Sequence, residues 1–495
     1  MIKYTSYIRS LFYEREKIMK KRLISAIMCL ALVSSLFAVP VSANAASVSD
    51  SATVSGSSAG ALIVGSNVVV SAQFNGTPAS DDGQVYLFEL KTYEYSIPDG
   101  AAPIASATAT STVTTTVPLN YTAGVSRLYN KFVYAVLRNG VWTTINNPQY
   151  IVNPEAVATK AKPRKPRPVK CFQEGNVCSI NLNGTGTDNP YYNVLHAVFY
   201  TDNINSPCAD PTAKSADSHP IRSNPINQYM LNANDEAGVA GLIADMVNYA
   251  THSDIQDYVI GNEVNERCWN YMAYTDWDTY VRKYTQVFRV CYTAIKSTNP
   301  NARVYVSIDQ VWDKNANSYE YIDGVDFLNK FNTMINTNGN LDWDLAIHPY
   351  PNPLYYPKFW DMSGVANGSK FTKQVSGNQV LTFQNLSIAS NLLCQSNFKN
   401  RSGQVRDIII SEIGMGSNAG VEAQAAGLAA AWAAFERNPY ITQFMYLEYD
   451  VNGFFPTLQG KSIEVWNALG TDKEAEVMEW AKKVIGISDW SQVLR

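Results

Sequence analysis

The stretch Asp257–Asn270, DYVIGNEVNERCWN, decides the fold, because it joins a short apolar run to a burst of polar side chains. The apolar run, 258–260, ends at a glycine, and amides and carboxylates follow it directly. A short apolar run bounded by a turn signal is typical of a buried strand. The polar residues that follow form either a surface turn or one half of an active site; they are Asn262, Glu263, Asn265 and Glu266.

Strand-like and helix-like segments alternate from this stretch to the C-terminus. Runs that are apolar on both faces and alternate with helices are typical of a parallel sheet covered by helices. We therefore predict an α/β fold, a (β/α)8 TIM-like barrel over residues 173–495, in preference to a doubly wound sheet. Only two clear strands and one clear helix precede residue 257 in this region, which leaves room for an irregular first half. The five strands from there onward are expected at 257–262, 302–309, 343–351, 405–414 and 441–450.

Two segments before the barrel differ from it in composition. Residues 60–155 hold short β-branched runs separated by Gly, Asn, Asp and Pro, which predicts a small all-β sandwich domain. Residues 156–172 form a linker in which Lys and Arg alternate with Pro. Such a linker is either a stiff, solvated spacer or a contact with the cell wall or another polyanion.

The N-terminal segment predicts export. Residues 1–45 contain a basic cluster, an apolar run and the small-residue site Ala43-Asn44-Ala45, a pattern typical of a secretory signal peptide; a single membrane anchor is the alternative. Without these residues the chain keeps 32 Lys and Arg and 41 Asp and Glu, a net charge of −9, which disfavours nucleic-acid binding. No later run is apolar enough to span a membrane. We therefore expect a secreted or cell-surface protein without a nucleic-acid partner.

The cysteines permit disulfides but do not predict a metal site. Six remain after residue 45, an even number in a chain expected to be exported. Cys171 and Cys208 are both local candidates to pair with Cys178, and the sequence leaves the pairing open. No Cys or His cluster has zinc spacing, and no dinucleotide or phosphate-loop motif is present. We expect no metal and no cofactor.

Polar side chains stand at the carboxyl ends of all five predicted strands, where the chemistry of a (β/α)8 barrel gathers. Glu263 follows the expected fourth strand and Glu412 the expected seventh. These strands lie on opposite walls of an eight-membered ring, so their side chains can face each other across its mouth. Two such carboxylates are what glycosidic-bond hydrolysis needs, one to protonate the leaving oxygen and one to attack the anomeric carbon.

Here the sequence resembles a known group of enzymes. GNEVN at 261–265 and ISEIG at 410–414 resemble the motifs of clan A glycoside hydrolases, the (β/α)8 group that includes cellulases, mannanases and β-glycosidases. A β-sandwich followed by such a barrel is similar to a bacterial, secreted, cellulase-like family of undefined substrate. The resemblance implies a retaining enzyme with Glu263 as acid/base and Glu412 as nucleophile. It also implies that Asn262 binds the sugar 2-hydroxyl.

Further candidates for substrate binding lie on the neighbouring strand ends. HPYP at 348–351 also resembles the clan, which implies that Tyr350 bonds the nucleophile and His348 lines the cleft. Asp309 either binds a sugar hydroxyl or caps a loop, and the aromatic residues either stack on sugar or pack in loops. Many clan members carry a Trp on strand eight, where this chain has Glu448 instead. The remaining aromatic candidates are Trp269 and Trp312.

The leading prediction is a secreted retaining glycoside hydrolase that acts on a polysaccharide or oligosaccharide. A non-catalytic carbohydrate-binding or cell-surface protein on a degenerate glycosidase barrel is the alternative, since the first half of the barrel is thin. A surface adhesin is a third reading, suggested by the sandwich and the basic linker. The distance between the two carboxylates discriminates between the first two of these readings, because retaining glycosidases hold them about 5–5.5 Å apart.

Overall fold

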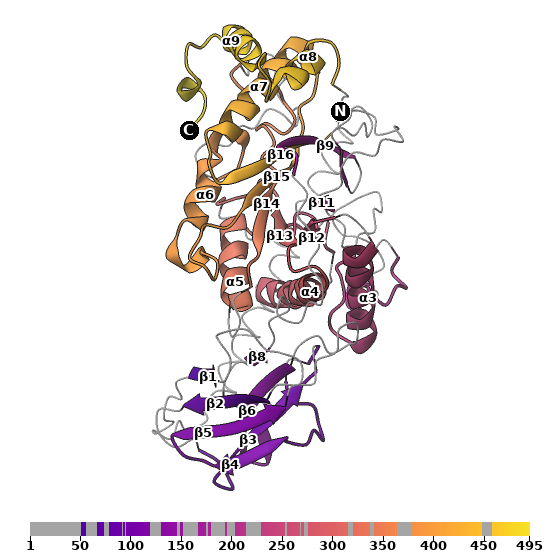
Figure 1. Ribbon diagram of the computed structural model, residues 1–495, viewed down its shortest axis with the longest axis vertical. Coiled ribbons are helices and arrows are strands. Elements are labelled where there is room, and N and C mark those ends of the chain that lie inside the picture. Colours follow the sequence, from indigo (N-terminus) through magenta and orange to yellow (C-terminus); the bar gives the residue numbers. More distant parts are fainter. Residues whose placement is uncertain are drawn as a thin grey trace, which may run out of the picture.

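A computed structural model of the protein describes residues 51–55, 67–73, 79–118, 130–151, 167–179, 194–195, 203–213, 229–363 and 379–495, with gaps inside several of these ranges. Figure 1 shows a group of β-strands at one end and an assembly of strands and helices above it. No helix of the described residues is both long and apolar enough to cross a membrane. The predicted signal peptide, residues 1–45, lies outside the described residues.

The N-terminal part of the described chain, residues 51–151, contains strands only, and every pairing among them is antiparallel. One sheet has the order β1-β2-β5 and the other has β4-β3-β6-β7, with β8 beside β6. Asn139 and Gly140 take positive φ angles of 52° and 73° between β6 and β7, as a tight hairpin turn requires. The sandwich domain remains a prediction. Its strands are β1 (Ser51–Ser55), β2 (Asn67–Gln73), β3 (Gln84–Leu90), β4 (Ala105–Thr108), β5 (Thr112–Pro118), β6 (Asn130–Arg138), β7 (Val141–Thr144) and β8 (Gln149–Ile151).

The rest of the described strands close into a ring with helices on its outside, which confirms an α/β barrel-like fold. Neighbours from β11 through β16 and on to β9 are parallel, whereas β10 is antiparallel to both of its neighbours. The strands are β9 (Lys170–Glu174), β10 (Val177–Ser179), β11 (Val194–Leu195), β12 (Asp257–Ile260), β13 (Arg303–Ile308), β14 (Asp344–Ile347), β15 (Ile408–Ile413) and β16 (Ile441–Leu447).

The ring departs from a regular (β/α)8 repeat at β9 and β10. Only residues 175–176 separate these two strands. A parallel crossover needs a dozen or more residues. A connection as short as this one can therefore only make an antiparallel hairpin. The irregular first half therefore begins with a hairpin in place of a βα unit, and β12 and β15 remain the fourth and seventh strands of the ring in chain order.

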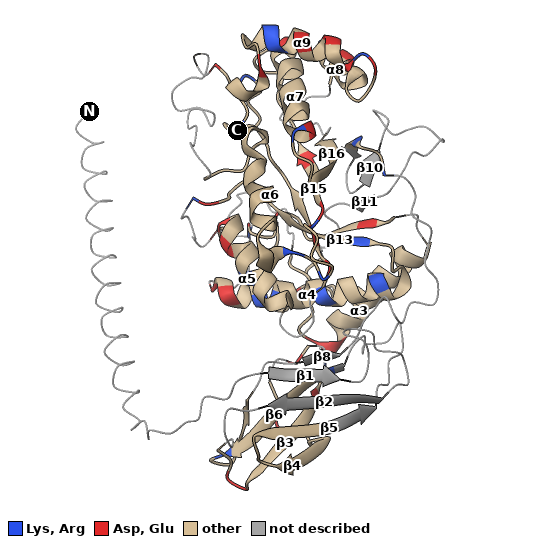
Figure 2. Ribbon diagram, turned by 60° about the vertical axis from the view of Figure 1, so that its left-hand side comes forward, with Lys and Arg blue, Asp and Glu red and all other residues tan. Residues whose placement is uncertain are grey.

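Helices cover the parallel strands from outside. α4 begins after Asp276, whose carboxylate accepts hydrogen bonds from the backbone N–H groups of Asp278 and Thr279. Figure 2 shows Lys, Arg, Asp and Glu on α4, α5 and α9, at the outside of the molecule. The helices are α3 (Glu236–His252), α4 (Trp277–Thr298), α5 (Gly324–Asn336), α6 (Ser387–Leu393), α7 (Val421–Glu436), α8 (Lys461–Ala468) and α9 (Glu474–Ile485), with the 3-10 turns η2 (Phe383–Asn385), η3 (Ser396–Phe398) and η4 (Trp490–Gln492).

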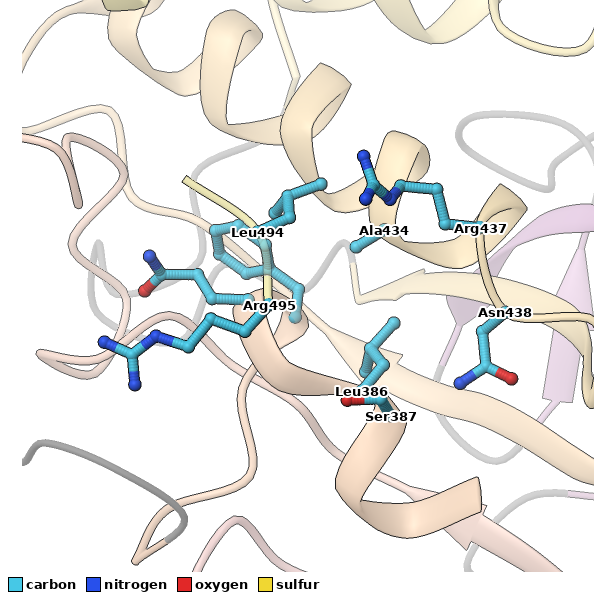
Figure 3. Close-up of a pocket in the computed structure, with 9 residues that line it drawn as sticks. Leu386, Ser387, Ala434, Arg437, Asn438, Leu494 and Arg495 are labelled. Atoms are coloured by element: carbon cyan, nitrogen blue, oxygen red, sulfur yellow. The ribbon is translucent and has the colours of Figure 1, made fainter. Parts of the chain in front are cut away.

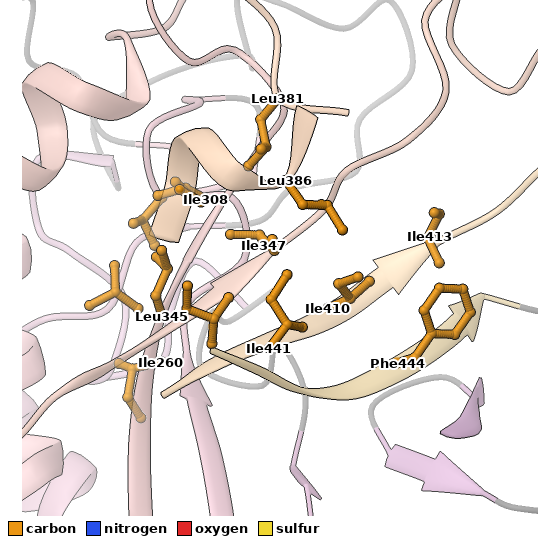
Figure 4. Packing of buried hydrophobic residues seen from close by; sticks show 14 of the residues in the cluster. Ile260, Ile308, Leu345, Ile347, Leu381, Leu386, Ile410, Ile413, Ile441 and Phe444 are labelled. Carbon is orange, nitrogen blue, oxygen red and sulfur yellow. The ribbon is translucent and has the colours of Figure 1, made fainter. Parts of the chain in front are cut away.

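Alternate residues of the strands face two separate apolar layers. The outward residues join the helices in the main core, and Figure 4 labels Ile260, Ile308 and Ile410 among them. A second cluster fills the inside of the ring with one side chain from each of six strands, which is the layering expected of a barrel interior. Its members are Cys171, Val259, Tyr305, Ala346, Ile409 and Met445.

The cysteine pairing is partly decided by these positions. Cys171 is disulfide-bonded, and its partner lies outside the described side chains. Cys208 is a thiol, so the predicted alternative that pairs it with Cys178 is wrong. Cys208 lies instead against Gly241 of α3, where its sulfur is 2.6 Å from the position that a Cβ of Gly241 would take. A glycine at 241 therefore makes room for the thiol.

Arg167, from the predicted linker, lies in the floor of the barrel at the N-terminal ends of the strands. Its guanidinium donates to the Tyr305 hydroxyl at 2.7 Å and to the Asp407 carboxylate at 2.9 Å, and it lies 3.4 Å from Asp257. Burial alone would lower the pKa of Arg167, but the Tyr305 phenol and both carboxylates raise it. The described end of the linker is therefore part of the barrel, while residues 156–166 lie outside the described residues.

Asp344 adds a pH-dependent contribution to this floor. Burial and the neighbouring Asp407 charge raise the pKa of Asp344 to about 7, above the value of about 3.9 for an unfolded chain. The folded state then holds the proton more tightly, so stability is lost as the pH rises through about 7. We expect Asp344→Asn to raise Tm relative to the wild type by a margin that widens from about pH 4 to about pH 8.

Asp342→Asn is the matched control for that measurement. Burial alone would raise the pKa of Asp342, but hydrogen bonds from Arg401 lower it below its ordinary value. A depressed pKa contributes stability that is present at neutral pH and lost as the pH falls. The amount by which Asp342→Asn lowers Tm should therefore shrink as the pH falls. If the Tm of Asp344→Asn and that of the wild type changed in parallel with pH, the expectation for Asp344 would be contradicted.

Candidate active site

The stretch that follows β12 makes a tight bend with two left-handed residues. Gly261 has a φ of 78° and Glu263 has a φ of 44°, an uncommon conformation for a residue with a side chain. The neighbouring strand β13 holds this bend, because the Ser307 hydroxyl accepts from the Glu263 N–H at 3.3 Å and the Ser307 carbonyl accepts from Val264 N–H at 2.9 Å. Unusual backbone held by its surroundings is found most often at functional sites.

Three predicted site residues, from three different strand ends, meet at this bend. His348 Nδ1 lies 2.8 Å from Glu263 Oε1 and 3.9 Å from Glu412 Oε2. One carboxylate oxygen of each glutamate and this ring nitrogen all lie within 4.8 Å of one another. His348 is fully buried, whereas side-chain exposures of 12% and 15% leave the two glutamates a small opening to solvent. The carboxylates therefore face each other, as their strand positions predict.

The surroundings shift the proton affinities of this group. Burial raises the pKa of Glu263, and the Glu412 and Asp309 charges add to this, while the His348 hydrogen bond opposes it. Burial alone would lower the pKa of His348, but the charges of Glu412 and Glu263 and the hydrogen bond to Glu263 raise it above its ordinary value. A buried carboxyl with a raised pKa is suited to carry a proton near neutral pH.

Tyr350 and Asn262 complete the polar surface beside the glutamates. The Tyr350 hydroxyl donates to Glu412 Oε1. The Asn270 side chain donates to the Asn262 carbonyl and so fixes its backbone. The Asn262 side-chain oxygen is buried and has no hydrogen-bond partner, which is uncommon for a buried polar atom. An orphaned acceptor next to Glu263 is suited to receive a hydroxyl of a bound ligand.

Asp309 lies at the end of β13 in the same polar region. Its Oδ1 accepts from the Asn265 side chain at 2.7 Å and from Val311 N–H at 2.8 Å. Burial and the nearby Glu266 charge raise its pKa to about 7. Both of these bonds engage Oδ1, as in a loop cap, and Oδ2 is the carboxylate oxygen that they leave for a further hydrogen bond.

The aromatic candidates are placed differently from one another. Trp269 is half-buried in the turn after β12. Trp312 is only 3% exposed and packs in the main core, so it has little surface to offer a sugar ring. Glu448 lies outside the described residues. A pocket of about 180 Å³ between η2, α6, the end of α7 and the C-terminal residues contains none of the predicted site residues (Figure 3).

Sequence reasoning missed Ser307 and Ser411. Both are fully buried, and their hydroxyls lie 3.3 Å and 3.0 Å from His348 Nε2. Their signal was a small polar residue inside an otherwise apolar strand, as in VYVSI and IIISE. Ser307 shares the inward face of β13 with Tyr305 and Asp309, because side chains two positions apart lie on one face of a strand.

The same group of side chains can be compared with a metal site. One potential ligand atom from each of Glu263, His348 and Glu412 lies within 4.8 Å of the other two. Zinc ligands lie about 2.0–2.2 Å from the ion, so neighbouring ligand atoms of a tetrahedral site are about 3.4 Å apart. The Nδ1–Oε1 distance of 2.8 Å is shorter than this and is that of a direct hydrogen bond. As arranged, His348 bonds Glu263 directly, and Glu412 lies 3.9 Å from the same ring nitrogen.

Solved structures to which this chain is similar include glycoside hydrolases. One is an endo-β-1,3-glucanase of Sorangium cellulosum, at 12% identity and a TM-score of 0.29, over 48% of this chain and 75% of that one. A β-glucosidase of Pyrococcus furiosus matches at 17% identity and a TM-score of 0.32, over 51% of this chain and 62% of that one. A family 39 glycoside hydrolase of Bacteroides cellulosilyticus matches at 12% identity and a TM-score of 0.33, over 79% of this chain and 75% of that one.

At such TM-scores these likenesses carry no argument about this chain. No curated protein matches it. The profile of one sequence family matches residues 203–493, more than half of the chain, and that range includes Glu263, His348 and Glu412. The chain therefore belongs to the family described as a family of unknown function, DUF5722.

Proposed function

We propose that the protein is a secreted, retaining glycoside hydrolase that cleaves O-glycosidic bonds of a polysaccharide or oligosaccharide. The observation that carries the proposal is the approach of Glu263 and Glu412, with carboxylate oxygens within 4.8 Å of each other. Retaining enzymes hold their carboxyl groups about 5–5.5 Å apart, and inverting enzymes about 6.5–9.5 Å apart to admit a water molecule. The short separation supports direct attack by one carboxylate.

In the first step of the proposed mechanism, Glu412 Oε2 attacks the anomeric carbon and forms a covalent ester. The glycosidic bond breaks at the same time, and its oxygen leaves with the proton of Glu263. Tyr350 holds the other oxygen of Glu412 and orients Oε2 towards the sugar. The raised pKa of Glu263 supports its role as the proton donor.

In the second step, the ionised Glu263 takes a proton from water, and the water oxygen attacks the anomeric carbon of the ester. The bond to Glu412 breaks, the sugar is released with its original configuration, and both glutamates return to their starting states. Asn262 would accept a hydroxyl of the sugar, since its side-chain oxygen has no protein partner. Asp309 and Trp269 would contact neighbouring parts of the glycan.

The irregular ring supports a second candidate, a non-catalytic carbohydrate-binding or cell-surface protein on a degenerate barrel. The observation in its favour is the β9–β10 hairpin, which replaces a βα unit of the regular repeat. Under both candidates we propose that the protein is exported, binds a carbohydrate and has no nucleic-acid partner. We also propose a cell-wall contact through linker residues 156–166. Binding of a glycan without hydrolysis would favour this second candidate.

The proposal is tested by incubating the protein with aryl glycosides and polysaccharides and following products by proton NMR. Retention predicts that the β-anomer of a β-glycoside product forms first and then mutarotates. Initial release of the opposite anomer would show inversion and would refute the double displacement. Absence of hydrolysis across the panel would refute the proposed activity.

Tyr350→Phe is expected to lower kcat/KM by roughly 10- to 100-fold, because a hydrogen bond to a charged group is worth about 1.5–3 kcal/mol. The variant keeps the ring and loses the donor to Glu412. Steady-state kinetics measure this effect. Tyr355→Phe is the matched control, because the Tyr355 ring packs edge-on against Tyr350 at 5.0 Å. Equal losses in the two variants would contradict a specific role for the Tyr350 hydroxyl.

A further inference from the structure

His348 is the centre of a buried hydrogen-bond group that spans three adjacent strands. Its Nδ1 faces Glu263 Oε1 at 2.8 Å. Its Nε2 faces two hydroxyls, Ser411 Oγ at 3.0 Å and Ser307 Oγ at 3.3 Å. β13 and β15, which carry the serines, flank β14, which ends just before His348. Both serines and the histidine are fully buried.

The hydrogen-bond geometry of the serines favours one of the two positions for the ring proton. Ser307 Oγ already accepts from the Glu263 N–H, so its own proton is free to donate. Among the described residues, His348 Nε2 is the acceptor within hydrogen-bond distance of either serine hydroxyl. Buried hydroxyl protons are rarely left without an acceptor. An accepting Nε2 would place the ring proton on Nδ1, where it would point at Glu263 Oε1.

This arrangement bears on the proton that the proposed reaction needs. One proton can lie either on Glu263, with a neutral His348, or on His348, with an ionised Glu263. Glu412, at 3.9 Å, and Asp309 also face the ring, and their charges favour the imidazolium. An imidazolium would need Nε2 as a donor, which would remove the single lone pair that the two serine hydroxyls share. The serines therefore favour a neutral His348, whereas the carboxylates favour a protonated one.

We propose that Ser307 and Ser411 are positioning residues that keep His348 neutral, with its proton on Nδ1, so that the acid proton stays on Glu263. Because Glu263 Oε1 then accepts from Nδ1, the proton of the acid lies on Oε2, the oxygen left for the substrate. The role in catalysis rests on the proposed glycosidase function. The tautomer of His348 does not, and it can be measured separately.

The tautomer is tested by NMR on the full chain labelled with ¹⁵N in its histidine rings. The chain has only 4 histidines, and His348→Asn assigns the resonances of interest. At neutral pH we expect Nδ1 of His348 to be protonated and Nε2 to be unprotonated. A protonated Nε2, alone or together with Nδ1, would overturn the proposal whether or not any glycoside is hydrolysed.

The catalytic consequence is tested with Ser411→Ala, because Ser307 also accepts from the Glu263 N–H and has two roles. With an alkyl glycoside, whose departure needs a proton, kcat/KM should fall about tenfold, which is a part of the roughly 10²- to 10⁴-fold contribution of general acid catalysis. With a dinitrophenyl glycoside, whose leaving group needs no proton, kcat/KM should change little. Ser411→Thr, which keeps a hydroxyl, should restore the alkyl-glycoside rate.

Ser462→Ala is the control for loss of a buried serine hydroxyl, since Ser462 is fully buried and bonds Gln424 at 2.7 Å, far along the chain from the site. Equal losses on both substrates in Ser411→Ala would show a general packing defect and would overturn the proposed positioning role of Ser411. A wild type that cleaves neither glycoside would refute the proposed function, and the ring resonances would still decide the tautomer.

Discussion

Glu412→Gln is expected to lower kcat/KM by at least about 10⁴-fold on any glycoside that the wild type hydrolyses, since loss of a nucleophile costs that much or more. The amide is nearly isosteric and its carbonyl oxygen can still accept from Tyr350, so the fold should survive. An uncharged amide cannot form the glycosyl ester. Initial rates on an activated aryl glycoside measure the loss, and Tm verifies the fold.

Two further measurements make this result specific. Glu422→Gln removes an exposed carboxylate in the first turn of α7 and should leave kcat/KM unchanged. In Glu412→Ala, azide can enter the space of the carboxylate and should restore turnover, giving a glycosyl azide of inverted configuration. If Glu412→Gln retained wild-type activity, the nucleophile would be another residue and the double displacement would have to be reassigned.

Arg167→Met is expected to cost roughly 3 kcal/mol of barrel stability, at the low end of the 3–5 kcal/mol for breaking a buried ion pair. The low end applies because 13% of the Arg167 side chain remains exposed and Arg303 still pairs with Asp407 at 2.7 Å. The change leaves Asp257 without its guanidinium neighbour in the floor of the barrel. Denaturant unfolding followed by Trp fluorescence measures the effect.

Arg303→Met is the matched variant for this experiment. Arg303 bonds the same Asp407 carboxylate, but its side chain is 30% exposed, so its loss should cost less. A stability of Arg167→Met equal to that of the wild type would mean that the guanidinium contributes nothing net in the floor. The predicted linker would then behave as the solvated spacer that its composition suggests.

The regular part of the barrel follows from patterns within single segments. Strands β12 to β16 are apolar runs bounded by turn signals, and each was predicted within a few residues of its observed place. Their order in the ring follows from their order in the chain, so the facing of Glu263 and Glu412 could be predicted from counting strands. The hairpin of β9 and β10 was not predicted, because β9 begins at Lys170, inside the segment 156–172 whose composition predicts a linker.

The sequence alone determined which strand ends carry polar side chains, because alternating side chains and turn signals are local properties of the chain. Only the tertiary structure decided what Ser307, Ser411 and Arg167 do. Ser307 is 104 positions from Ser411, with which it shares the neighbour His348. Arg167 is 240 positions from Asp407, which it contacts. A serine in a strand or an arginine in a basic linker has no distinctive local pattern. Its role comes from the burial and the hydrogen-bond partners that ring closure brings to it.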